Sequence, residues 1–260
     1  MSYEFLRWSV EDRVATVWLD RPPVNAVNQA MYRELRELFG DVSQMGEDVR
    51  AIVLAARGRH FCAGNDLNEF RTLSPENSPA RMREVRAAFF AIQDAPLPVI
   101  GAVHGTAVGT GLAIAASCDF IVAAAGARLG VTEIRVGVMG AAKHLSRLVP
   151  EPVVRSMFFS GEPLPVEDLV GYGAVIAVVD PDELLPEALR RARQIAAHSP
   201  AAIRFAKRAL NRIEFMELKP AYEYEQSLTG ELSGHPDSKE AINAFFESRE
   251  PAYGGPENAR

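Results

Sequence analysis

Cysteine is scarce in this sequence of 260 residues, which has only Cys62 and Cys118. Two cysteines exclude a disulfide framework and a four-cysteine zinc site. Both lie among apolar neighbours. We therefore expect buried, reduced thiols in a cytoplasmic protein.

Basic residues are fewer than acidic residues, and the sequence has no long uninterrupted apolar run. The chain has 28 lysines and arginines against 34 acidic residues, a formal net charge of −6, whereas a nucleic-acid partner favours a basic surface. The most apolar stretch, residues 99–125, is interrupted by His104 and Asp119, and a membrane-spanning helix needs about 20 apolar residues. Residues 1–10 include Glu4 and Arg7 and have no apolar targeting core. We expect no nucleic-acid partner, no membrane partner and no targeting segment here.

Several common catalytic and nucleotide-binding motifs are absent as well. A dinucleotide fingerprint would need a third glycine after Gly109 and Gly111, but Ile114 stands at that position. The sequence has no phosphate-binding G-x-x-x-x-G-K-[ST] loop, no G-x-S-x-G elbow and no H-E-x-x-H zinc helix. Its glycine-rich segments therefore need another explanation.

Short apolar segments alternate with amphipathic ones, as in an α/β fold with mostly parallel strands. Strands are predicted over residues 14–19, 51–55, 99–103 and 120–124. Apolar residues at helical spacing predict helices over residues 31–45, with Asn28 as N-cap, and over 82–92 and 112–117.

Beyond Pro181 the sequence predicts helices alone, over residues 184–197, 201–213, 221–232 and 238–246. We therefore divide the chain into an α/β core, residues 1–197, and a helical C-terminal region, residues 198–260, within one functional unit. The last stretch, residues 251–260, is rich in glycine and proline and is expected to fray.

Three segments carry residues suited to chemistry. Residues 58–67 and 104–111 each follow a predicted strand, and their small residues let backbone N–H groups approach a ligand. The second segment also opens a helix, whose N-terminus favours negative charge. Residues 129–134 hold a carboxylate, Glu133, in an apolar run. Two simpler interpretations stay open at this point: the glycines form tight turns, and Glu133 is solvated or pairs with Arg128 or Arg135.

The order of several short motifs over the whole chain resembles the enoyl-CoA hydratase/isomerase (crotonase) superfamily. The motifs are Pro23-Val24-Asn25-Ala26-Val27, Phe61 to Leu67 (FCAGNDL), Gly105-x-Ala107-x-Gly109-x-Gly111, Cys118-Asp119, Glu133-x-x-x-Gly137, Asp237-x-Lys239-Glu240-Ala241 and Phe245-x-x-x-Arg249-x-Pro251. The resemblance implies a spiral of ββα turns with a C-terminal helical trimerisation region, and a homotrimer or a dimer of trimers. It also implies an acyl-CoA thioester as substrate, a role in fatty-acid metabolism, and no metal or redox cofactor.

The resemblance also implies the site residues. The backbone N–H groups of Asn65 and Thr110 would form an oxyanion hole for the thioester carbonyl. Thr110 stands where the family usually has glycine, so the donor is kept while the added side chain is expected to crowd the hole. Substrate-binding residues would be Val24, Ala26, Ala63, Asn65, Asp66, Leu67, Gly109, Ala113 and Ala141.

The acid/base residues depart from the pattern of the family's hydratases, which use two glutamates. The first position is Ala113 here, and the second is Glu133. A single glutamate suffices in the family's isomerases, so we expect an isomerase or an atypical hydratase with Glu133 as acid and base. An apolar pocket around Val131, Ile134 and Val138 would raise its pKa.

Two alternatives stay open. The chain could be a non-catalytic acyl-CoA-binding protein. Alternatively, Lys143 or His144 could supply the missing group in a decarboxylation or hydrolysis, although both could simply face solvent. Basic residues should meet the coenzyme A phosphates, with Arg57, Arg59, Arg71, Lys239 and Arg249 as candidates. Acyl selectivity would depend on the space between Phe70 and the helix that contains Phe89 and Phe90.

Overall fold

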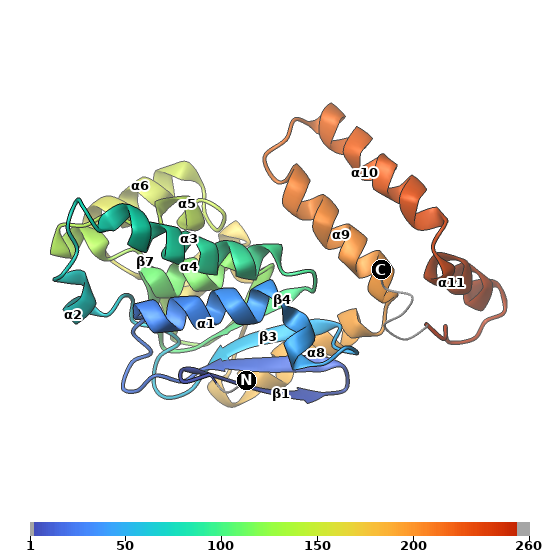
Figure 1. Cartoon of the computed structure of the whole chain (residues 1–260), viewed down its shortest axis with the longest axis horizontal. Helices are drawn as coiled ribbons and strands as arrows, with labels where there is room; N and C mark the ends of the chain where they lie inside the picture. Colours follow the sequence, from blue (N-terminus) through green and yellow to red (C-terminus); the bar gives the residue numbers. More distant parts are fainter. Residues whose placement is uncertain (1–2, 254–260) are drawn as a thin grey trace.

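A computed structural model describes residues 3–253, which form two β-sheets and the helices around them (Figure 1). The larger sheet has the strand order β1-β2-β3-β4-β6-β9, with β1 Leu6–Glu11, β2 Val14–Leu19, β3 Ala51–Ala56, β4 Val99–Val103, β6 Phe120–Ala124 and β9 Ala177–Val179. The smaller sheet has the order β5-β7-β8, with β5 Thr106–Val108, β7 Arg128–Gly130 and β8 Leu164–Pro165. The α-helices are α1 Gln29–Gly40, α2 Leu67–Phe70, α3 Ser78–Asp94, α4 Thr110–Ser117, α5 Ala142–Leu145, α6 Glu151–Ser160, α7 Val166–Leu169, α8 Leu184–Ala196, α9 Pro200–Ile213, α10 Leu218–Ser233 and α11 Pro236–Phe246.

The pairing confirms the predicted α/β class with mostly parallel strands. From β2 to β9 each pair of adjacent strands in this sheet is parallel, and only the β1–β2 pair is antiparallel. One turn of the chain consists of β4 in the larger sheet, β5 in the smaller sheet and then helix α4. The next turn again places one strand in each sheet, β6 in the larger and β7 in the smaller. Successive ββα turns therefore bring their strand ends to a common region.

The larger sheet is covered on both faces. In β3, Ile52 and Leu54 face the main core, whereas Val53 and Ala55 face a second cluster that includes Ala188 of α8. Such two-sided burial explains why the residues of β3 are continuously apolar.

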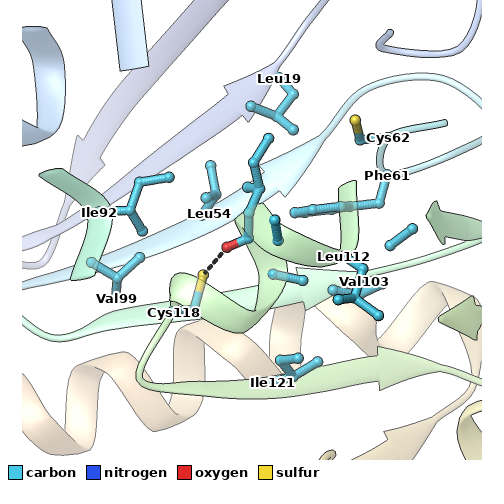
Figure 2. Packing of buried hydrophobic residues seen from close by; sticks show 14 of the residues in the cluster. Leu19, Leu54, Phe61, Cys62, Ile92, Val99, Val103, Leu112, Cys118 and Ile121 are labelled. Atoms are coloured by element: carbon cyan, nitrogen blue, oxygen red, sulfur yellow. Dashed lines mark hydrogen bonds between the residues drawn. The ribbon is translucent and has the colours of Figure 1, made fainter. Parts of the chain in front are cut away.

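Both cysteines are buried, as predicted, and burial raises the pKa of each thiol to about 12. Figure 2 shows the Cys118 thiol among the buried residues of the main core, where it donates to the Ile114 carbonyl at 3.5 Å. At neutral pH both thiols are therefore protonated packing groups.

The helix predicted over residues 31–45 ends earlier than expected. Asn28 is its N-cap, as predicted, and its side chain accepts from the Met31 N–H. However, α1 ends at Gly40, and Val42 and Met45 lie in a separate 3₁₀ helix. The Asp41 carboxylate accepts from the Ser43 N–H and starts this new turn. The apolar spacing continued, but the capping aspartate broke the helix.

Five strands were not predicted from the sequence: β1, β5, β7, β8 and β9. Strand β1 forms a hairpin with β2 through Asp12 and Arg13, both at positive φ, without the glycine that usually marks such a turn. Strands β5 and β7 have three residues each, too few to show a period.

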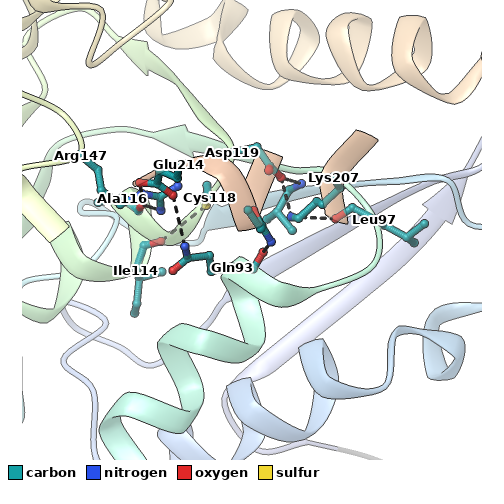
Figure 3. Close-up of polar contacts among 11 residues, drawn as sticks. Gln93, Leu97, Ile114, Ala116, Cys118, Asp119, Arg147, Lys207 and Glu214 are labelled. Atoms are coloured by element: carbon teal, nitrogen blue, oxygen red, sulfur yellow. Dashed lines mark hydrogen bonds and ion pairs between the residues drawn. The ribbon is translucent and has the colours of Figure 1, made fainter. Parts of the chain in front are cut away.

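The helices beyond α8 lie to one side of the α/β core, and Figure 1 shows α9, α10 and α11 in orange to red. Buried Lys207 of α9 ties this region to the core, because its ammonium donates to the Leu97 carbonyl and pairs with Asp119 at 2.7 Å (Figure 3). Arg147 pairs with Glu214 at 2.8 Å and adds a second tie. The division into residues 1–197 and 198–260 stays a prediction.

Two further expectations concern the C-terminal end and membranes. Residues 251–253 have no helix or strand, and the rest of the predicted frayed stretch lies outside the described residues. No helix of the described part combines the length and the apolarity that crossing a membrane requires.

Candidate active site

A cavity of about 610 Å³ lies where the loop after β3 meets the first residues of α4. Most of the predicted substrate-binding residues line it: Val24, Ala26, Ala63, Asn65, Asp66, Leu67 and Gly109. Thr110 and Glu133 line it as well, so the structure brings the predicted donors and the predicted acid/base residue together. Ala113 is 1% exposed and Ala141 packs against the main core, and neither is among the residues that line the cavity. The substrate contacts of all these residues stay predictions.

The backbone around Asn65 directs its N–H away from the neighbouring segment. Val27 and Asn65 form a parallel β-bridge, in which the Val27 N–H donates to the Gly64 carbonyl and the Asp66 N–H donates to the Val27 carbonyl. In this pattern the residue between the two partners points its own N–H and C=O to the other side. Within residues 3–253 the Asn65 N–H has no backbone partner.

The Thr110 N–H is left unpaired by the start of a helix. Thr110 is the first residue of α4, and the first N–H groups of a helix have no partner within it. Gly109 precedes it at φ 55° and ψ −118°, a conformation that favours glycine. No backbone acceptor for the Thr110 N–H occurs among the described residues. Two cavity-lining residues thus offer unpaired amide donors.

The Glu133 carboxylate lies between two glycines. A Cβ on Gly109 would come within 2.9 Å of Glu133 Oε1, and one on Gly140 within 3.0 Å. Glu133 Oε2 is buried and has no hydrogen-bond partner in the described part of the chain. Burial therefore raises the pKa of this carboxyl above its ordinary value.

The surroundings of Glu133 correct two expectations. It forms no ion pair within residues 3–253: Arg135 pairs with Glu162, and Arg128 donates to the Pro163 carbonyl. Of the predicted apolar neighbours, Val131 is buried and Val138 lines the cavity, but Ile134 is 42% exposed. The 3₁₀ helix Glu133–Val136 turns the Ile134 side chain outward.

The Tyr32 side chain contacts the side chains of both donor residues, Asn65 and Thr110, and the sequence analysis did not predict this. This side chain of α1 is 1% exposed. Its hydroxyl donates to Asn65 Oδ1 at 2.6 Å and lies 2.8 Å from Thr110 Oγ1. The Thr110 hydroxyl is thus held by Tyr32. One signal was available: a tyrosine on the apolar stripe of a helix must find a partner for its hydroxyl.

Arg21 was missed as well, although it lines the cavity. Its guanidinium pairs with Asp66 at 2.6 Å and donates to the Ala26 carbonyl, so it ties residues 21–26 to the loop after β3. The pairing lowers the pKa of Asp66. The Asp66 carboxylate also caps α2 by accepting from the Asn68 N–H. Asp66 therefore holds the wall of the cavity as a charged group.

Comparison with known proteins identifies the family of this chain. The sequence model of the family described as Enoyl-CoA hydratase/isomerase matches residues 9–256. The chain belongs to the enoyl-CoA hydratase/isomerase family.

Relatives in the enoyl-CoA hydratase/isomerase family carry different activities in their names. A protein of Mycobacterium tuberculosis, named (7aS)-7a-methyl-1,5-dioxo-2,3,5,6,7,7a-hexahydro-1H-indene-carboxyl-CoA hydrolase, is 38% identical over 86% of this chain and 90% of its own length. A short-chain-enoyl-CoA hydratase of Clostridium acetobutylicum is 30% identical over 92% and 93%. The crystal structure of an enoyl-CoA hydratase of Mycobacterium smegmatis superposes with a TM-score of 0.90 at 35% identity, covering 96% and 98%. The comparisons thus confirm the predicted crotonase fold.

Lys143 and His144 lie outside the cavity of this enoyl-CoA hydratase/isomerase family member. Neither is among the described residues that line it. The His144 ring packs edge-on against Phe89 at 4.9 Å, and burial lowers the pKa of His144 to about 4. Lys143 is exposed, with its ammonium 4.2 Å above the Phe215 ring. The expectation of solvent exposure holds for Lys143, whereas His144 is half-buried.

The residues proposed for coenzyme A and for acyl selectivity are only partly near this cavity. The Arg57 guanidinium stacks over Trp18, and Arg249 pairs with Glu240. Phe70 lines the cavity, whereas Phe89 is buried against Tyr32 and Phe90 is exposed on α3. Among the described lining residues Arg21 is the basic side chain, and Asp66 neutralises it. The coenzyme A contacts of this family member therefore stay predictions.

Proposed function

We propose that this protein is an enzyme that binds an acyl-CoA thioester in the cavity near Asn65, Gly109 and Glu133. The N–H groups of Asn65 and Thr110 hold the carbonyl oxygen, and Glu133 moves a proton. One observation supports this most strongly: a buried carboxylate oxygen without a hydrogen-bond partner lies in the same cavity as two unpaired amides.

The amides and the carboxylate have complementary tasks. Two preorganised donors stabilise the negative charge that develops on the thioester oxygen when the α-carbon loses its proton, and the loss of one such donor typically costs about 10²–10³ in rate. The ionised Glu133 accepts that proton, and the resulting carboxylic acid returns it to another carbon. The electron pair of the broken C–H bond passes through the enolate, and the double bond migrates. No other proton acceptor is consumed.

The arrangement favours isomerisation over hydration by two glutamates. Hydration by that route needs a second carboxylate, and position 113 carries only the methyl group of an alanine, buried within α4. The reaction we propose is therefore double-bond migration in an enoyl-CoA, or an atypical hydration that uses Glu133 alone.

Hydrolysis is a second candidate, which two relatives favour. Proteins named as hydrolases of the same bicyclic CoA thioester, in Mycobacterium tuberculosis and Rhodococcus jostii, are 38% and 35% identical to this chain. In a hydrolase the Glu133 carboxylate would deprotonate a water molecule. Lys143 and His144 take no part in this candidate, because both lie outside the cavity wall.

The test is the exchange of acyl-CoA protons for deuterium, followed by NMR in deuterated water. The panel contains 2-enoyl, 3-enoyl and saturated thioesters together with the bicyclic dioxo-indene-carboxyl-CoA. We expect α-proton exchange and migration of the double bond, both lost in Glu133→Gln. Hydrolysis of the bicyclic thioester without proton exchange on the simple thioesters would favour the second candidate.

A non-catalytic acyl-CoA-binding protein is the remaining alternative, and the same panel separates it. Tight binding without exchange, migration or hydrolysis of any thioester would overturn the proposed enzyme. Full exchange activity in Glu133→Gln would overturn the role of the carboxylate while leaving the enzyme.

A further inference from the structure

Tyr32, Asn65 and Thr110 form a chain of hydrogen bonds with a defined direction. The Asn65 Oδ1 atom carries no proton, so the single proton of the Tyr32 hydroxyl is donated to it at 2.6 Å. Thr110 Oγ1 lies 2.8 Å from the same phenolic oxygen and must be the donor of that second bond. The direction therefore runs from Thr110 through Tyr32 to Asn65.

The phenol at the centre of this chain is buried and packed on both its backbone and its ring. The Tyr32 N–H bonds to the Asn28 carbonyl in the first turn of α1, and the ring packs edge-on against Phe89 at 5.9 Å. Asn65 follows β3 and Thr110 opens α4, so α1 holds residues from two separate turns of the fold.

A main-chain β-bridge between Cys62 and Ala107 joins the two segments nearby. The Val108 N–H donates to the Cys62 carbonyl at 3.1 Å, and the Cys62 N–H donates to the Thr106 carbonyl. The chain then continues on both sides to the donor residues, which Tyr32 ties together through their side chains. Each of these side chains shares its Cα with one of the two unpaired amides.

From this geometry we infer that Tyr32 is a positioning residue that sets the separation and direction of the Asn65 and Thr110 amide donors; the inference rests on the proposed function. It also gives the Thr110 side chain a task, as the donor that engages Tyr32. Tyr32 is not among the described residues that line the cavity, so it acts through its two partners. Burial raises its pKa, which keeps the phenol protonated.

The experiment removes the Tyr32 hydroxyl and measures the stretching frequency of the bound thioester carbonyl. Tyr32→Phe keeps the ring against Phe89 and deletes both hydrogen bonds. Butyryl-, octanoyl- and lauroyl-CoA, labelled with carbon-13 at the thioester carbonyl, are bound to the wild type and the variant, and the carbonyl stretch is measured by difference infrared spectroscopy. We expect a lowered frequency in the wild type and a return toward the solution value in Tyr32→Phe.

Kinetics add a second readout. A misplaced oxyanion donor should lower kcat for proton exchange about 10-fold to 100-fold. Affinity for the saturated thioester should change less than kcat, because a misplaced donor costs most where negative charge develops on the carbonyl oxygen.

Further variants keep the inference testable if Tyr32→Phe folds poorly. Thr110→Val breaks the same chain from its other end and should produce the same frequency change, and Thr110→Ser should restore part of it. Tyr32→Phe combined with Thr110→Val should be no worse than either variant alone, because both break one chain. Tyr3→Phe is the matched control, since its hydroxyl bonds to Gln44, away from the cavity.

The outcomes separate this inference from the proposed function. The carbonyl frequency requires binding but not turnover, so an enzyme without proton exchange could still show the expected change. An unchanged frequency in Tyr32→Phe, or additive effects in the double variant, would overturn the inference alone. Failure of all three thioesters to bind would overturn both.

Discussion

The carboxylate of Glu133 lies where an ionised group is poorly solvated, since one of its oxygens is buried without a hydrogen-bond partner among the described residues. Stability is commonly lost at such a group and is offset elsewhere in the fold. Its raised pKa has consequences for activity and for stability, and each can be measured separately.

Activity should rise with pH through the titration of Glu133. Proton removal needs the ionised carboxylate, so kcat/KM for α-proton exchange should increase with pH and level off above the pKa of this group. Because burial raises that pKa, the midpoint should lie above 4.5. Glu133→Gln should lower the rate about 10²–10⁴-fold and abolish this limb. A wild-type profile that is flat from pH 4 to 8 would contradict the assignment.

Stability should change in the opposite direction. A carboxyl whose pKa is raised on folding stabilises the folded protein fully below its unfolded pKa, and this contribution is lost as pH rises through the folded pKa. Glu133→Gln should therefore raise Tm at pH 7 and raise it less at pH 4. Each 1 kcal/mol gained in the free energy of unfolding corresponds to a rise in Tm of about 2–4 °C. Thermal unfolding at both pH values is the measurement. Exposed Glu223→Gln is the control, and a lower Tm for Glu133→Gln at pH 7 would count against the burial argument.

Gly140 should matter for catalysis more than for folding. A Cβ there would lie 3.0 Å from Glu133 Oε1, and the backbone at this position needs no positive φ. We expect Gly140→Ala to displace the carboxylate and lower kcat for exchange about tenfold, with a small change in Tm. Gly171→Ala is the matched control, because no atom lies within 4 Å of its added Cβ. Equal activities of the two variants would show that the contact is relieved without cost.

The residues show what the sequence could reveal about the site. Asn65, Thr110 and Glu133 were predicted because motif order carries them, and the structure places them around one cavity. Tyr32 and Arg21 were missed because their roles depend on partners far along the chain, Asn65 and Asp66. The spacing of apolar residues shows that a side chain is buried, but it says nothing about which polar atom it meets.

At the scale of elements, strand and helix positions followed from apolar patterning where an element was long. Strand β2 and helices α8 to α11 lie close to their predicted ranges. Errors occurred where a local hydrogen bond overrode the pattern, as at Asp41, and where a strand had only two or three residues. The longer elements β1 and α6 were also missed. The short strands β5 and β7 precede the segments that carry Thr110 and Glu133, so the elements hardest to predict are those that position the site.

Helix α9 should loosen when its buried ion pair is removed. The Lys207 ammonium bonds to Asp119 and to the Leu97 carbonyl. Lys207→Met should lower the free energy of unfolding by about 2 kcal/mol, less than the roughly 3–5 kcal/mol of a fully buried pair because the Asp119 side chain is 27% exposed. Hydrogen exchange should accelerate in α9. The substitution of an exposed lysine, Lys219→Ala, is the control. Unchanged hydrogen exchange in α9 would mean that the Arg147–Glu214 ion pair alone is enough to hold this helix on the core.

At the scale of the whole molecule, the helical C-terminal region presents apolar side chains to solvent. Phe245 and Phe246 of α11 are 79% and 80% exposed, and Leu218 of α10 is 82% exposed. Large exposed apolar groups commonly mark contacts between proteins. This pattern supports the expectation of a homotrimer or a dimer of trimers, which stays a proposal for this chain.

The mass of the protein in solution tests that proposal. Light scattering should give three or six times the chain mass of 28.4 kDa. Phe245→Ser combined with Phe246→Ser should reduce the mass toward that of one chain, because both rings would lose an apolar contact. Val10→Ser on β1, also an exposed apolar position, should leave the mass unchanged. A single-chain mass for the wild type would exclude the assembly.

The separate origins of the donors and the acid/base group bear on how such a protein can acquire a new reaction. The two amides are main-chain groups placed by a β-bridge and a helix start, so a side-chain substitution other than one to proline leaves the N–H in place. The carboxylate is one side chain, and position 113 beside the site already carries an alanine. Under the proposed function, descendants can therefore replace the proton-handling group one mutation at a time and still inherit the two amide donors. Relatives named as hydratases and as hydrolases at similar identity are what such an inheritance would produce.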